Sequence, residues 1–177
     1  SPGILTGRDD DLVGEPLPGS TGTPAPFGYG LDYLRIVGPV GVTLKHLQMK
    51  YSYNYCINFL NAGTMNEVWH CQFVHSLGLW AENVTLKVRN ALFHDFAIAV
   101  DGFNFSANIQ HMTGHTCWWD FTSGLGSFEL WNSLMSDVPL PSGYTPPSHV
   151  AWYVSEQPGL FATVGAGGHY LANATHR

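Results

Sequence analysis

The feature that most constrains the fold is a run of imperfect repeats of roughly twenty residues, which fills the centre of the chain. When five segments are aligned, one polar column contains His46, His70, Asn90, His111 and Asn132. Its members follow one another at intervals of 24, 20, 21 and 21 residues. A fixed period in this range is typical of a solenoid, in which each repeat forms one turn and stacks on the next.

Apolar and polar residues alternate within each repeat, as expected of a strand with one buried face. Two residues before the polar column, the side chains are aliphatic: Leu44, Val68, Val88, Ile109 and Leu130. Three residues after it stand Met49, Phe73, Phe93, Gly114 and Met135. The residues suited to the outside are Lys45, Trp69, Arg89, Gln110 and Trp131. Because a helix needs apolar spacings of three and four, the repeats predict β-strands.

The rung length, the inward columns and the Asn/His column resemble the right-handed parallel β-helix superfamily, the pectate-lyase-like solenoids. This resemblance implies an all-β, right-handed parallel β-helix of about five to six rungs. The column from His46 to Asn132 would then be a structural ladder beside the core, whose side chains hydrogen-bond to stacked neighbours. Because the superfamily includes both enzymes and non-catalytic surface proteins, the resemblance does not decide the function.

The length of 177 residues fits one domain. Residues 1–40, rich in Gly and Pro, are predicted to form an extended N-terminal wrap or cap. Residues 41–138 hold the β-helix repeats, and residues 139–177 contain a loop, a further strand and a Gly-rich segment. That last segment is similar to segments that follow β-helix repeats in large bacterial extracellular proteins. The similarity implies an extracellular or cell-surface location, and a parent chain that continues past Arg177.

The amino-acid composition argues against nucleic acid as a partner and against a membrane span, and it favours contact with other protein chains. Charged residues make up only 11% of the chain, aromatic residues make up 14%, and the formal net charge is −6. The acidic balance argues against a nucleic-acid partner. No apolar run approaches the length of about 20 residues that spans a bilayer, so no membrane span is predicted. Open strand edges at the solenoid ends invite another chain, and abundant aromatic residues favour contact surfaces.

We therefore predict a non-catalytic extracellular structural or interaction module, such as a subunit of a fibre or surface assembly. It would associate end to end or side to side with copies of itself or with neighbouring domains of a larger parent chain. Pectate-lyase-like enzymes require acidic Ca²⁺ ligands in register on neighbouring rungs, and the acids of this chain do not form one column. No catalytic residue and no cofactor is predicted.

The alternative is a polysaccharide-active lyase or glycosidase, or a carbohydrate-binding β-helix. Trp69 and Trp131 take outward positions, where an indole stacks on a sugar or contacts a partner protein. Asp95 and Asp120 are the acids that such a groove would use. Alanine substitutions of these acids would abolish activity if the alternative is right.

Three histidines outside the ladder are weak candidates for a metal site. His94 and His115 share a column, and His75 stands one position further on in the preceding rung. Stacked imidazoles can bind Zn²⁺ or Cu²⁺. A hydrogen-bonded polar row is the favoured interpretation, so no metal is predicted.

The sequence allows N-glycosylation at three sites and more than one state of its three cysteines. Sequons for N-glycosylation begin at Asn83, Asn104 and Asn173. The cysteines are Cys56, Cys71 and Cys117. Their odd count and irregular spacing fit small buried side chains as well as one disulfide with a free thiol.

Overall fold

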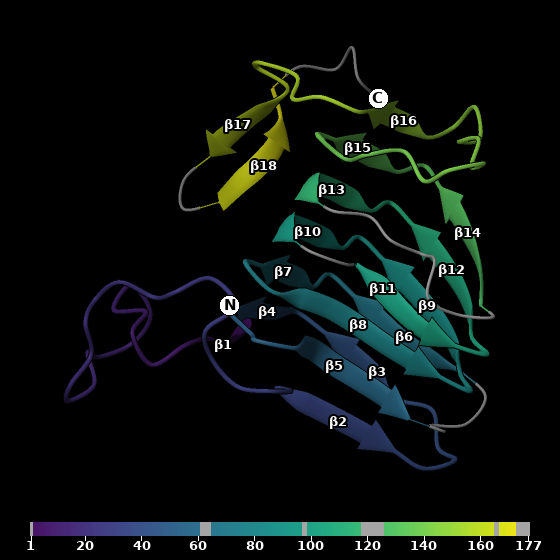
Figure 1. Cartoon of the computed structure of the whole chain (residues 1–177). Coiled ribbons are helices and arrows are strands. Elements are labelled where there is room, and N and C mark those ends of the chain that lie inside the picture. The colour runs from purple at the N-terminus through teal and green to yellow at the C-terminus, as the bar shows by residue number, and fades with distance from the viewer. Residues whose placement is uncertain (1, 61–64, 97–98, 118–125, 165–166, 173–177) are drawn as a thin grey trace.

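A computed structural model describes residues 2–60, 65–96, 99–117, 126–164 and 167–172. This part of the chain consists of β-strands, turns and loops, and it contains no helix that could cross a membrane. Parallel strands stack into a β-solenoid of about five turns (Figure 1). The structure thus confirms the predicted all-β parallel solenoid.

Three parallel sheets form the walls of the solenoid. The seven-stranded sheet contains β1 (Gly3–Leu5), β4 (Leu47–Lys50), β7 (Gln72–Val74), β10 (Leu92–Phe96), β13 (Thr113–Cys117), β15 (Leu134–Ser136) and β16 (Ala151–Tyr153). The four-stranded sheet contains β2 (Leu34–Val37), β5 (Tyr55–Leu60), β8 (Leu77–Glu82) and β11 (Val100–Phe103). The five-stranded sheet contains β3 (Thr43–Lys45), β6 (Asn66–Trp69), β9 (Thr85–Arg89), β12 (Ser106–Gln110) and β14 (Ser127–Trp131).

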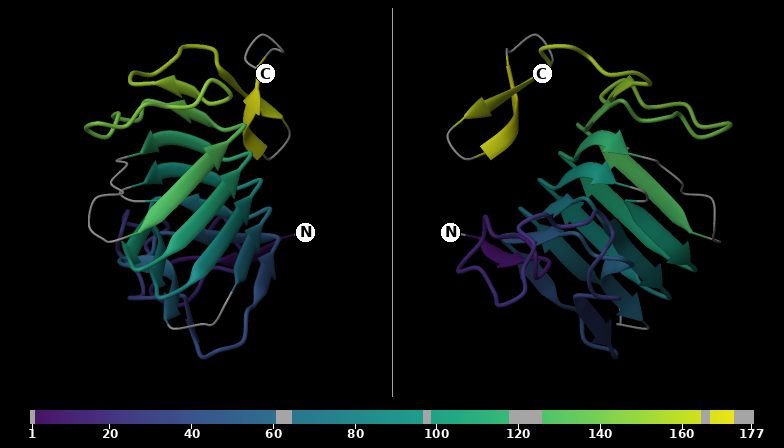
Figure 2. Two further views of the ribbon diagram at one scale, coloured as in Figure 1. Left: turned by 90° about the vertical axis from the view of Figure 1, so that its right-hand side faces the viewer. Right: turned by 60° about the vertical axis from the view of Figure 1, so that its left-hand side comes forward.

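Along the chain, each full turn contributes one strand to the four-stranded sheet, then one to the five-stranded sheet and then one to the seven-stranded sheet, as β5, β6 and β7 do. Strands β2, β3 and β4 form the first full turn, and β2 pairs with β5 of the next turn. Strand β1 pairs with the other side of β4, so it lies one step beyond the first turn in the seven-stranded sheet. After the solenoid, β17 (Phe161–Val164) and β18 (Gly167–Leu171) form an antiparallel hairpin. Figure 2 shows this hairpin beside the stacked turns, on the same side as the N-terminal loop.

The pairing register reproduces the alignment of the repeats. Leu44 pairs with Val68, and the same column continues to Leu130. The column from Met49 to Met135 is likewise in register, and all its members are buried. Where this column has Gly114, a Cβ atom would lie 2.6 Å from the sulfur of Met135, so a larger side chain would require Met135 to move. The two inward columns are therefore confirmed.

The four-stranded sheet supplies the rest of the core. The sequence predicts inward positions for a second sheet at Ile57, Phe59, Leu79, Ile98, Val100, Trp118 and Phe121. Of these, Ile57, Phe59, Leu79 and Val100 are buried in the four-stranded sheet, and the other three lie outside the described residues.

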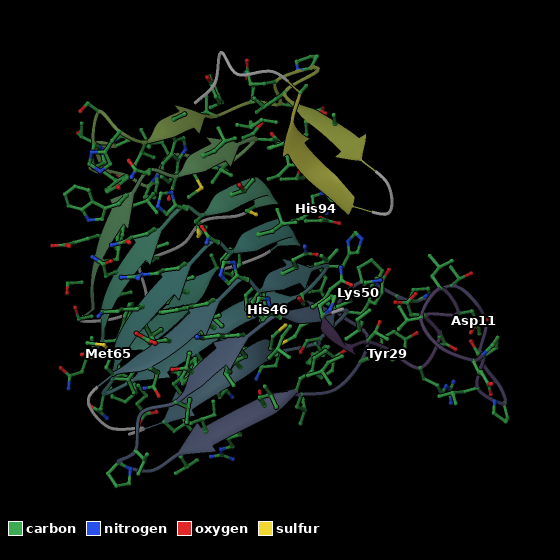
Figure 3. The ribbon with its side chains drawn as sticks, turned by 180° about the vertical axis from the view of Figure 1, so that it is seen from behind. Asp11, Tyr29, His46, Lys50, Met65 and His94 are labelled. Atoms are coloured by element: carbon green, nitrogen blue, oxygen red, sulfur yellow. The ribbon has the colours of Figure 1, made fainter. Side chains whose placement is uncertain are left out.

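A buried ion pair attaches the segment between β1 and β2, residues 6–33, to the solenoid. This segment is called the wrap below. The Lys50 ammonium lies 3.1 Å from Oδ2 of Asp10, whose side chain is fully buried. Thr6 donates to the same carboxylate oxygen at 2.7 Å, and the Tyr33 hydroxyl donates to the Lys50 carbonyl at 2.6 Å. The Tyr29 amide donates to the Tyr51 carbonyl at 3.0 Å, and Figure 3 labels Tyr29 and Lys50 in the region where the wrap meets the sheet. The wrap is thus held by specific polar contacts.

Candidate functional site

The predicted ladder marks one corner of the solenoid, between the five-stranded and the seven-stranded sheet. All five of its residues have positive φ angles, from 46° at Asn132 to 56° at His46. Asn and His tolerate this left-handed conformation better than most other residues do. The column therefore recurs because the backbone turns in the same way on every coil.

The side chains of the ladder are exposed, which differs from the expected position beside the core. The rings of His46 and His70 stack with centroids 5.1 Å apart, and the amide of Asn90 lies 3.4 Å from Nδ1 of His70. Contacts between stacked neighbours thus occur, as expected, but on the surface. Their contribution is smaller than that of a buried network because water competes for the same groups.

Sequence reasoning missed a second left-handed corner, between the seven-stranded and the four-stranded sheet. Its members are Tyr51, His75, Asp95, Thr116 and Asp137, with φ angles from 49° to 64°. Each follows a ladder residue by five positions, so the repeat itself carried the signal.

The sequons at Asn83 and Asn104 mark the third corner, where both residues also have positive φ. Asn104 donates to Oδ1 of Asn83 at 2.7 Å, and Asn173 lies outside the described residues.

The outer face of the five-stranded sheet carries a stack of cationic and aromatic side chains. The Lys45 ammonium lies 4.1 Å from the centre of the Trp69 ring, and the Arg89 guanidinium lies 5.4 Å from it. Further along the column, Trp131 stacks on His149 with centroids 4.5 Å apart. Both faces of the Trp69 indole are therefore covered by cations from adjacent turns. Trp131 is 44% exposed, but His149 covers one of its faces.

The proposed sugar groove is not assembled as expected. Trp69 and Trp131 lie on the five-stranded sheet, whereas Asp95 lies in β10, at the corner of the seven-stranded sheet. Asp120 lies outside the described residues. The structure therefore does not bring Asp95 together with the two tryptophans, because side chains on different walls of a solenoid face different directions.

A row of rings crosses the outer side of the seven-stranded sheet. It consists of Tyr51, His75, His94, His115 and Phe161, with successive centroids 5.2, 5.8, 5.3 and 4.9 Å apart. Nδ1 of His75 lies 2.5 Å from Oδ2 of Asp95. Burial lowers the pKa of His115, although the nearby carboxylates of Glu156 and Asp137 act in the opposite direction. The structure thus brings together the three histidines that the sequence singled out.

Neither metal ligation nor disulfide formation is found among the described residues. No group of three or more His, Cys, Asp or Glu side chains there is arranged to hold a metal ion. Cys56, Cys71 and Cys117 are buried, and they form no disulfide in the described part of the chain. Burial raises the pKa of the Cys56 thiol to about 12, so it stays protonated at neutral pH. The cysteines therefore act as small core residues.

A groove of about 690 Å³ lies beside the last turns, between the ladder corner and residues 148–153. It is lined by His111 and Asn132 of the ladder corner, by His149 and Tyr153, and by Leu171 of the hairpin. Its volume lies within the range of small-molecule sites.

The two ends of the solenoid differ. At the last turn, Tyr144 packs between Phe128 and Trp152, with ring centroids 5.3 and 5.6 Å away. The Trp152 indole donates to the Val138 carbonyl at 2.8 Å, and Met135 beneath is fully buried. Residues 139–153 therefore cover this end.

The first turn has less cover among the described residues. Leu34, Ile36, Val42 and Leu44 point toward the core but are only partly buried, whereas their partners on the next turn, including Ile57 and Val68, are fully buried. The large exposed apolar side chains of this turn are Leu31, Val37 and Val40, at 69%, 67% and 73% exposure. In their sheets, β1, β2 and β3 each have a neighbour on one side only, as do β14 and β16 at the other end, so the two ends differ in exposed apolar surface and not in strand edges. This end is therefore apolar and retains unpaired strand edges.

Comparison of the chain with protein-family models, with curated proteins and with solved structures gave no match. The functional assignment therefore rests on the geometry of the chain's own residues.

Proposed function

We propose that the chain is a non-catalytic structural or interaction module, extracellular or on the cell surface, which docks to another β-structured chain through its first turn. One observation carries the proposal: the inward residues Leu34 and Ile36 of β2 and Leu44 of β3 are only partly buried, whereas their partners on β5 and β6 are fully buried. Apolar surface beside unpaired strand edges favours contact with another strand, because both backbone hydrogen bonds and apolar burial then become available.

The difference between the two ends indicates the form of the assembly. A fibre built end to end needs two complementary open ends, whereas residues 139–153 cover the last turn. Contact between the first turns of two copies gives a closed pair, because the same surface is used on both sides. Contact with a neighbouring domain of a larger parent chain uses the same strand edges. We also propose kinship with the pectate-lyase-like β-helices, supported by rung length and inward columns alone.

Sedimentation velocity over a wide range of protein concentration tests the docking surface. We expect the wild-type chain to shift toward a dimer as concentration rises. Val37→Asp combined with Val40→Asp should keep the chain monomeric, because two charges would then enter the contact. Leu140→Asp is the matched control: this exposed apolar residue lies in the segment that covers the last turn, so the substitution should leave dimerisation unchanged. A wild-type chain that stays monomeric and cleaves a polysaccharide would contradict the proposal.

A second candidate function is carbohydrate binding on the outer face of the five-stranded sheet. Lys45 and Arg89 flank Trp69 there, and Lys87 pairs in register with Glu67 on the same sheet. The buried N–H groups at Trp69 Nε1 and Arg89 Nε have no hydrogen-bond partner among the described residues, and both are hydrogen-bond donors. Calorimetric titration with oligosaccharides tests this candidate. Binding that is lost in Lys45→Ala and Lys87→Ala but retained in Val37→Asp would favour it over docking at the first turn.

A further inference from the structure

One of the three walls at the first turn carries an extra strand. Strand β1 pairs in parallel with β4, and Leu5 lies opposite Met49. In the described part of the chain, β2 and β3 have no strand beyond them in their sheets. Because neighbouring strands lie about 4.8 Å apart, β1 stands about one strand spacing beyond the edges of β2 and β3 (Figure 1). This end of the solenoid is therefore stepped and not flat.

Few contacts hold β1 in the described part of the chain. The Gly3 amide donates to the His46 carbonyl at 2.9 Å, and Leu5 packs against the core. Gly3 is exposed, and Ile4 is 40% exposed. Pro2, just before the strand, has no N–H group to donate. A short edge strand of this kind protects a sheet edge, but its small burial makes it easy to displace.

The wrap that follows β1 is anchored separately. Asp10 pairs with the Lys50 ammonium at 3.1 Å, and the Phe27 amide donates to the His75 carbonyl at 3.3 Å. These contacts do not involve residues 2–5. Strand β1 can therefore separate from β4 while the wrap stays on the solenoid.

Strand β1 occupies the place that a strand of another chain would take on β4. Beyond Leu5 the inward column continues with Met49, which is fully buried, and with Phe73 on the next turn. When β1 leaves, the edge of β4 and the Met49 side chain become accessible. Apolar surface beside a free strand edge favours pairing with another strand, so release of β1 extends the docking surface to the third wall.

We propose that β1 is a displaceable blocking strand: two copies of the chain dock closely through their first turns when residues 2–5 leave β4 and a strand of the partner copy takes their place. This inference rests on the proposed function, because it concerns the same docking surface. The occupant is a second copy, because a symmetric pair presents the same step from both sides. Two retained β1 strands would lie between the copies and keep their β2 and β3 edges from pairing directly with each other.

NMR of the wild-type chain as a function of concentration tests the displacement. At low concentration we expect cross-peaks between the methyl groups of Leu5 and Met49, which lie in one inward column. As the dimer forms, these cross-peaks should disappear while the amides of β2 gain protection from exchange. If β2 gains protection and the cross-peaks remain, docking stands but displacement of β1 is wrong. If neither changes, the proposed docking fails and this inference fails with it.

A charge on the inward side of β1 should strengthen association. Leu5→Asp weakens the contact of β1 with the core, so the docking surface is free in a larger fraction of molecules. Because the apparent dissociation constant varies inversely with the fraction of competent molecules, we expect it to fall by about tenfold or more. Ile4→Asp is the matched control: it adds the same charge to the same strand at an exposed position and should leave dimerisation unchanged. Sedimentation velocity measures both, and equal effects, or no effect of Leu5→Asp, would overturn the proposal.

A second variant keeps the test decisive if Leu5→Asp disrupts the first turn. Gly3→Pro removes the N–H group that donates to the His46 carbonyl and leaves the Leu5 side chain in place. We expect the dissociation constant of the dimer to fall again, while the circular dichroism spectrum stays that of the wild-type chain. A dimer that is weaker than the wild-type dimer, or equal to it, would overturn the proposal.

Discussion

At the scale of single residues, the backbone conformation at the corners of the solenoid explains why polar residues recur at fixed positions of the repeat. Asn, His and Asp recur where the backbone turns left-handed, and three columns of such residues mark the three corners. The polarity of these positions thus reflects backbone conformation and does not by itself indicate a binding site. Gly is absent from the ladder, although it would fit the conformation, so the stacked side chains add contacts of their own.

Substitution at a corner tests this explanation. Asn90 has a φ angle of 51°, a conformation that is strained for a β-branched residue. We expect Asn90→Val to lower the free energy of unfolding by about 1–2 kcal/mol, and Asn90→Gly to change it little. Urea denaturation measures both. Gln72→Val on β7, an exposed strand position, is the control and should be tolerated; an equal loss there would show that conformation is not the cause.

At the scale of elements, close backbone contact limits what one strand pair accepts. Gly102 on β11 pairs with Ala81 on β8, and its φ angle is 142°. A Cβ atom at Gly102 would lie 1.8 Å from the Ala81 carbonyl oxygen, which is backbone and cannot turn away. Glycine is therefore required by the spacing between these strands.

Gly102→Ala should accordingly be strongly destabilising. We expect a loss of about 3 kcal/mol or more, since the change combines backbone strain with overpacking. Thermal unfolding followed by circular dichroism measures it. Gly143→Ala is the comparison, because that glycine also has a positive φ but open space around it. A similar effect at both sites would argue that the β8–β11 contact is looser than described.

The ion pair between Lys50 and Asp10 predicts how the wrap responds to mutation. Lys50→Met leaves the buried Asp10 carboxylate without its cation, and breaking a buried pair typically costs about 3–5 kcal/mol. We expect faster proteolysis within residues 6–33. Adding Asp10→Asn should restore part of the protection, because no uncompensated charge then remains. No gain in the double variant would contradict the ion-pair account.

Acid should loosen the same contact. Burial acts to raise the pKa of Asp10, but hydrogen bonds from Thr6 and Lys50 outweigh it and the pKa is lowered from its ordinary value of 3.8. The pair therefore stabilises the wrap fully above that value, and the stabilisation is lost as the pH falls through and below it. Limited proteolysis with an acid-active protease should show this loss in the wild-type chain and not in Lys50→Met. An equal acid response in both proteins would contradict it.

At the scale of the whole molecule, the repeat was sufficient to predict the solenoid but not the difference between its ends. Strand columns could be found because each inward residue recurs at a fixed interval, as Val68 and Val88 do. The cover formed by Tyr144 and Trp152 has no counterpart in other turns, so no periodicity reveals it. The position of Asp95 on another wall from the tryptophans likewise depends on where each corner falls.

Hydrogen exchange measured as a function of protein concentration is the most direct test of docking through the open first turn. If two copies meet at this end, amides of β2 and β3 should gain protection as the concentration rises. Those of β14 and β16, near the covered end, should not change. A uniform response of both ends, or constant exchange in β2 and β3 at every concentration, would contradict docking through the first turn.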